Sequence, residues 1–114
     1  MEWTTERRYR RYEDWSNDEI KQIEEKMAKS PWHTHYHVEP KTGLLNDPNG
    51  FSYFDGKWIL FYQNFPFGAA HGLKSWVQLE SDDLVHFSET NVKVLPDTPL
   101  DSHGAYSGSA MQFG

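Results

Sequence analysis

The sequence predicts an all-β fold, made of one blade of a β-propeller and the start of a second blade, preceded by a short N-terminal helical arm. Residues 50–63 contain two aromatic-rich runs joined by Asp55-Gly56, a two-residue hairpin signal. Both faces of the second run are apolar, which is typical of a strand that is covered on both sides, as in a propeller blade. A run at 74–80 and an outer strand after the polar turn that begins at Ser81 complete a four-stranded sheet.

Residues 1–31 are expected to form the helical arm. Ser16 and Glu19 have capping-box spacing, because the serine can cap the first turn while the glutamate reaches back. Apolar residues then recur at helical spacing on one face: Ile20, Ile23 and Met27. Pro31 ends the pattern, since the residue before a proline is pushed out of the α region. The apolar stripe is narrow, so we expect the helix to pack against a larger body.

Residues 32–114 are expected to form the propeller unit, which the chain leaves incomplete. Residues 33–38 alternate, so His33, His35 and His37 would share one face of a strand. Three such histidines could hold zinc, but no carboxylate or cysteine is spaced to complete the site. An exposed polar face is therefore the preferred interpretation, and we predict no metal.

Two loops and a final strand follow the hairpin in this prediction. Residues 64–73 and 96–105 are rich in loop formers, and residues 106–113 are expected to open a strand of the next blade. A propeller blade is covered by its neighbours, so one blade alone would expose large apolar faces and tend to aggregate. We therefore expect 114 residues to be a fragment of a longer protein.

Composition excludes several function classes. The formal net charge is −6, which is the wrong sign for a nucleic-acid partner, and the arginines of residues 7–11 are diluted by acidic neighbours. There is no cysteine, so neither disulfides nor thiolate chemistry is expected. No apolar run is long enough for a signal peptide or a membrane span, which leaves the cytoplasm as the default compartment.

Asp47 is the candidate for chemistry. It lies in the run Leu44-Leu45-Asn46-Asp47-Pro48-Asn49-Gly50, just before the aromatic hairpin. Taken alone, Asp-Pro-Asn-Gly indicates a turn, because proline presets φ and Asn-Gly tolerates positive φ. A carboxylate held in a proline-braced turn also has little freedom, and orientation is a large part of catalysis.

The run at 44–50, the hairpin, and the segments 71–76, 81–87 and 106–110 together resemble the N-terminal part of glycoside hydrolase family 32, the β-fructofuranosidases. The resemblance covers residues 30–114 and is greatest to the bacterial branch that acts on sucrose 6-phosphate. It implies a five-bladed propeller, retaining hydrolysis of terminal β-fructofuranosides, and no cofactor or catalytic metal.

The resemblance also implies roles for residues. Hydrolysis with retention of configuration needs two carboxyl groups about 5 Å apart, and the resemblance implies that Asp47 is the nucleophile. It also implies sugar contacts at six matching positions: Asn46, Gln63, His71, Trp76, Tyr106 and Ser107. The family's acid/base glutamate, in a Glu-Cys motif, and its Arg-Asp-Pro motif have no counterpart in this sequence. Residues 1–114 alone are therefore expected to be inactive.

Simpler explanations exist for several of these positions. Asn46 can merely form the turn and Gln63 can end a strand. Packing is the preferred explanation for Trp76, and surface exposure explains a lone loop histidine such as His71. Lys74 could serve a phosphate, but a lysine at a loop edge is usually solvated.

Tyr106 replaces the family's phenylalanine, Leu44-Leu45 replaces Trp-Met or Leu-Met, and the stretch after Trp76 is bulkier than in many relatives. These departures leave the fructoside less certain than the reaction type.

The expected substrate is sucrose 6-phosphate or sucrose, and the runner-up is an exo-fructosidase that acts on inulin or levan. A non-catalytic carbohydrate-binding module, a decayed fragment or a structural propeller piece are the other classes. The predicted partner is a small-molecule sugar, with no nucleic acid or membrane, and the oligomeric state is left open.

Overall fold

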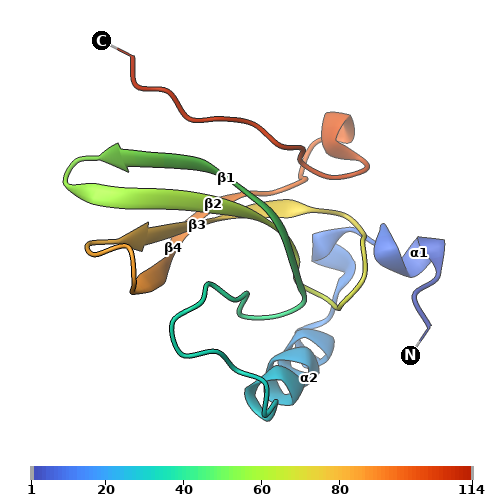
Figure 1. Ribbon diagram of the computed structural model, residues 1–114. Coiled ribbons are helices and arrows are strands. Elements are labelled where there is room, and N and C mark those ends of the chain that lie inside the picture. The colour runs from blue at the N-terminus through green and yellow to red at the C-terminus, as the bar shows by residue number, and fades with distance from the viewer. Residues whose placement is uncertain (1, 114) are drawn as a thin grey trace.

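A computed structural model describes residues 2–113 and shows one four-stranded antiparallel sheet with a helical arm packed at one end (Figure 1). The strands lie in chain order across the sheet: β1 Leu44–Phe54, β2 Lys57–Phe65, β3 Ser75–Ser81 and β4 Phe87–Val94. The predicted four-stranded sheet is confirmed. A short 3-10 helix, η2 Pro99–Asp101, interrupts the loop that follows β4.

The arm consists of three short helical segments: α1 Thr5–Arg8, η1 Tyr12–Asp14 and α2 Asn17–Ala28. The predicted capping box is present at the start of α2, where Ser16 Oγ accepts from the backbone N–H of Glu19 and the glutamate accepts from the backbone N–H of Ser16. Arg10 donates to the same glutamate at 3.0 Å, which ties the segment before η1 to the helix.

Aromatic stacking attaches the arm to the sheet. Trp15 and Phe67 stack with their ring centroids 4.1 Å apart, and Phe65 at the end of β2 is fully buried beneath them. Ile20 and Ile23 of α2 pack against this cluster. The expectation that the helix leans on a larger body is therefore confirmed, since aromatic pairs and apolar burial both favour the docked arm.

The hairpin between β1 and β2 has the predicted turn. Asp55 has a φ of 49° and Gly56 a φ of 78°, the pair of left-handed residues that a two-residue type I′ turn needs. Tyr62 of β2 and Val77 and Leu79 of β3 form the core of the sheet itself.

The expected turn at Asp47 is instead an irregularity inside β1. The β1–β2 register shifts between Asn46 and Asn49 and again between Asn49 and Ser52. Asp47 has a φ of 45°, and Gly50 has a φ of 62°. A proline cannot donate to the sheet ladder, so Pro48 is accommodated where the pairing is already interrupted. Turn-forming residues thus bend a continuous strand rather than ending it.

Two expected strands are not found within residues 2–113. Residues 33–38 do not form a strand: residues 35–37 are bends, and the nearby Glu39 carboxylate accepts from the backbone N–H of Thr34 at 3.0 Å. Residues 106–113 are extended and exposed but have no neighbouring strand to pair with in the described residues, and a strand needs such a partner for its ladder. Within residues 2–113, no helix has both the length and the apolar character to cross a membrane.

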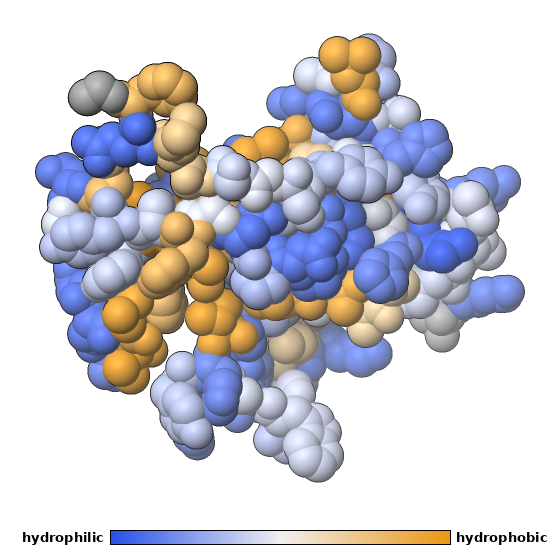
Figure 2. Space-filling view, turned by 45° about the horizontal axis from the view of Figure 1, so that its top comes forward, coloured by the Kyte–Doolittle hydropathy of each residue, from blue (hydrophilic) through white to orange (hydrophobic). Residues whose placement is uncertain are grey.

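Figure 2 shows hydrophobic patches between the hydrophilic parts of the surface. Independently of that view, large apolar and aromatic side chains of β1 and β4 are at least half exposed: Phe51, Tyr53, Phe54, Val92 and Val94. The predicted exposure of large apolar side chains is confirmed for these residues.

Candidate active site

One row of residues crosses the sheet and carries the candidate site. Asn46 of β1 pairs with Gln63 of β2, and Gln63 pairs with Trp76 of β3. Residues directly opposite one another in antiparallel strands point to the same face of the sheet. Three of the predicted sugar-contacting side chains are therefore brought together by strand register alone.

Hydrogen bonds join this row to the loop after η2. Asn46 Nδ2 donates to Gln63 Oε1 at 2.7 Å, and Gln63 Nε2 donates to the backbone carbonyl of Ala105 at 2.8 Å. The indole Nε1 of Trp76 donates to the same carbonyl at 3.0 Å. Trp76 and Gln63 are both buried. Trp76 therefore packs, as the simpler explanation expected, and it also fixes the position of a backbone acceptor.

Asp47 lies at the open edge of this row. Ser107 Oγ donates to its Oδ2 at 3.3 Å, across 60 positions of sequence. In a regular strand Asp47 would point to the face opposite Asn46, but its left-handed φ and the register shift re-aim the side chain. The local backbone thus brings a carboxylate and an amide to one site.

Lys74 is a member of the site that the sequence interpretation placed wrongly. It was expected to be solvated, but it is only 6 % exposed. Its Nζ donates to Asn46 Oδ1. Burial lowers the pKa of the Lys74 ammonium, and the nearby Asp47 carboxylate acts in the opposite direction.

The backbone around Gly104 explains why Lys74 is buried. Ala105 N–H donates to the carbonyl of Lys74 at 2.9 Å, which closes the loop over the lysine. Gly104 has a φ of 117°, and a Cβ there would lie 2.8 Å from the backbone nitrogen of Lys74. The signal available in the sequence was the small Gly-Ala pair ahead of Tyr106-Ser107, which indicates a close backbone approach.

His71 and Tyr106 are not brought into this network. His71 is exposed on the loop between β2 and β3. Tyr106 is 78 % exposed and borders a pocket of about 220 Å³ that is also lined by Trp76 and Phe61. Their assignment as sugar contacts stays a prediction.

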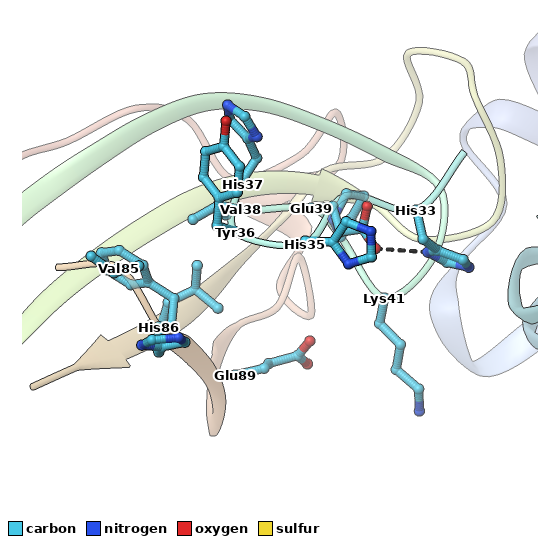
Figure 3. A pocket seen from close by; sticks show the side chains of 13 residues that line it. His33, His35, Tyr36, His37, Val38, Glu39, Lys41, Val85, His86 and Glu89 are labelled. Carbon is cyan, nitrogen blue, oxygen red and sulfur yellow. Dashed lines mark hydrogen bonds and ion pairs between the residues drawn. The ribbon is translucent and has the colours of Figure 1, made fainter. Parts of the chain in front are cut away.

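The three histidines of residues 33–37 line a separate pocket of about 460 Å³ between their own segment and the start of β4. Figure 3 shows that they are dispersed, with His33 turned toward Glu39 at 2.7 Å and away from His37. The Glu39 carboxylate raises the pKa of His33. Within residues 2–113, no group of three or more potential ligands is close enough to hold a metal ion.

Comparison with known proteins identifies the family. The model of the glycosyl hydrolases family 32 N-terminal domain matches residues 37–114, well over half of the chain. The chain belongs to glycosyl hydrolase family 32.

Known members of family 32 match most of the length of this chain. A sucrose-6-phosphate hydrolase of Streptococcus mutans serotype c is 71 % identical over 107 residues, which are 94 % of this chain and 22 % of that protein. The solved sucrose-6-phosphate hydrolase of Lactobacillus gasseri superposes with a TM-score of 0.91 at 50 % identity, over 98 % of this chain and 23 % of that one. The β-fructofuranosidase BmSUC1 of Bombyx mori gives a TM-score of 0.69 at 33 % identity, over 91 % of this chain and 22 % of that one. The chain thus spans less than a quarter of the length of these family 32 proteins.

Proposed function

We propose that this chain supplies the nucleophile-bearing part of a retaining β-fructofuranosidase that hydrolyses sucrose 6-phosphate. The observation that carries the proposal is the placement of the Asp47 carboxylate beside the Asn46–Gln63 row, with Ser107 donating to it. The relatives named as sucrose-6-phosphate hydrolases favour this substrate over a fructan. In this proposal residues 1–31 are the arm, and residues 32–114 are the first blade and the start of the second in a five-bladed propeller of a cytoplasmic protein.

In the proposed reaction, a carboxylate oxygen of Asp47 attacks the anomeric carbon of the fructosyl unit. The bond from that carbon to the bridging oxygen breaks, and an acid/base carboxyl supplies the proton that the departing glucose 6-phosphate needs. The same group then takes a proton from water, whose oxygen displaces Asp47 and releases fructose. The sequence of residues 1–114 contains no Glu-Cys motif to supply that second carboxyl.

The remaining residues bind and orient the sugar. Asn46 Nδ2 donates one hydrogen to Gln63 and Gln63 Nε2 donates one to Ala105, so each amide keeps a second hydrogen that suits a fructose hydroxyl. The Ser107 hydroxyl donates to the Asp47 carboxylate and so helps to fix its orientation. Buried side chains hold the amides in place, so little reorganisation is needed when the sugar binds.

A chimaera tests the proposal. Residues 1–114 replace the matching segment of the Streptococcus mutans enzyme, to which they are 71 % identical. Asp47→Asn is expected to lower kcat on sucrose 6-phosphate by about 10³-fold or more, because a nucleophile is lost. Asp55→Asn is the matched control, since asparagine suits the type I′ turn, and its kcat should stay within about twofold.

Initial rates on sucrose 6-phosphate and sucrose are measured for each variant, with residues 1–114 alone as the expected inactive control. A loss of less than about tenfold in Asp47→Asn would mean that Asp47 only shapes the strand, because removal of an acid/base group already costs ~10² or more. A non-catalytic sugar-binding role would then be favoured.

A further inference from the structure

Lys74 is a charged residue in the buried interior, where charges are rarely found. Lysine is almost never fully buried unless it is paired, because an ammonium loses hydration in the protein interior. Here the side chain is only 6 % exposed. Its direct acceptor is Asn46 Oδ1, a neutral oxygen, and the charged group that acts on it is Asp47. This arrangement lies within the proposed site rather than beside it.

The lysine fixes the direction of the amide chain. An ammonium can only donate, so Asn46 must turn Oδ1 toward Lys74 and Nδ2 toward Gln63. At the other end, the Ala105 carbonyl can only accept, so Gln63 must turn Nε2 toward it. The two amides therefore lie between a pure donor and a pure acceptor, and only one orientation satisfies every bond.

The carboxylate of Asp47 lies next to this chain of amides. The bulge in β1 places Asp47 directly after Asn46, whose side chain Lys74 holds. Ser107 faces the carboxylate from the segment after Ala105, while His103 of the same loop lies against Tyr9 instead.

We propose that Lys74 is a positioning residue of the fructosidase site: its buried ammonium sets the orientation of the Asn46 and Gln63 side chains beside Asp47. The proposal rests on the function proposed above. It assigns Lys74 to the nucleophile side of the reaction and not to binding of the substrate phosphate.

Two substitutions in the chimaera separate the hydrogen bond from the charge. Lys74→Met removes both the donor and the charge, whereas Lys74→Gln keeps a donor for Asn46 Oδ1 and removes only the charge. Lys74→Met is expected to lower kcat at least tenfold, because Asn46 and Gln63 lose the donor that orients them. Lys74→Gln should restore most of that loss.

Lys57→Met is the control, because Lys57 forms an exposed ion pair with Asp82 on the same sheet. Its kcat should stay within about twofold. Equal losses of kcat in Lys74→Met and Lys74→Gln, or a loss seen only as a higher KM for sucrose 6-phosphate than for sucrose, would overturn the proposal. So would failure of both Lys74 variants to fold while Lys57→Met folds, since Lys74 would then be structural. Activity retained in Asp47→Asn would instead overturn the proposed function itself.

Discussion

A single backbone carbonyl, that of Ala105, is the acceptor on which the candidate site converges. It takes one hydrogen bond from Gln63 and one from Trp76, and its own residue donates back to Lys74. The adjoining Gly104 makes this possible, because its φ of 117° is rarely adopted by residues with a side chain. The geometry of the candidate site therefore depends on a residue that has no side chain.

Gly104→Ala tests that dependence at the residue scale. The left-handed φ alone costs about 1–2 kcal/mol, and a Cβ placed 2.8 Å from Lys74 N adds a clash that the backbone must relieve. Gly56→Ala is the matched control, since its φ is 78° but no atom lies within 4 Å of the added Cβ. In the chimaera, Gly104→Ala should lower both the melting temperature and kcat by more than Gly56→Ala does. Equal losses would show that the close approach to Lys74 is unimportant.

At the scale of elements, the sequence predicts a feature well when its cause is local. The capping box at Ser16 and the turn at Asp55-Gly56 each depend on residues a few positions apart, and both are present. Residues 33–38 alternate like a strand but pair with none of the described strands, and the Glu39 carboxylate accepts from the backbone N–H of Thr34 instead. Asp47 was predicted to lie in a turn, whereas pairing with β2 turns the same local geometry into a bulge. Non-local partners decide both cases.

The helical arm leads to a prediction about how the stability of the fold depends on pH. Donation from Arg10, followed by the bonds to Ser16, lowers the pKa of Glu19 from 4.5 to about 2. Because the folded-state pKa is lowered, this stabilisation is present above pH 4.5 and is lost as the pH falls toward 2. The melting temperature of Glu19→Gln should therefore lie below that of the parent chimaera at neutral pH, and the difference should shrink as the pH falls below 4.5. Glu25→Gln, at an exposed position on the same helix, should match the parent throughout. A gap that stays constant with pH would contradict the role of ionised Glu19.

At the scale of the whole molecule, the candidate site joins parts of the chain that no local pattern connects. The bond from Ser107 to Asp47 and the bond from Gln63 to Ala105 span 60 and 42 positions. Resemblance to family 32 supplied most of these residues, but not Lys74, whose burial depends on the loop that closes over it through Ala105. Burial of a polar side chain is set by the surrounding fold, and a single sequence gives little signal for it.

Exposed apolar surface gives the last prediction. Tyr53 of β1 is 58 % exposed and Val92 of β4 is 50 % exposed, and both belong to the outer strands of the sheet. Unpaired edges and exposed apolar side chains favour association at micromolar concentrations. Residues 1–114 alone should therefore self-associate in sedimentation velocity experiments, with a mean mass that rises with concentration.

Tyr53→Lys/Val92→Lys should weaken this association. Ser88→Lys/Asn91→Lys is the matched control, because it adds the same two charges at exposed polar positions of β4 and leaves the apolar side chains in place. If both double variants reduce association equally, net charge and not apolar surface controls it. If residues 1–114 sediment as a monomer at every concentration, the exposed side chains of the outer strands do not drive association, and the sheet is stable without a covering partner.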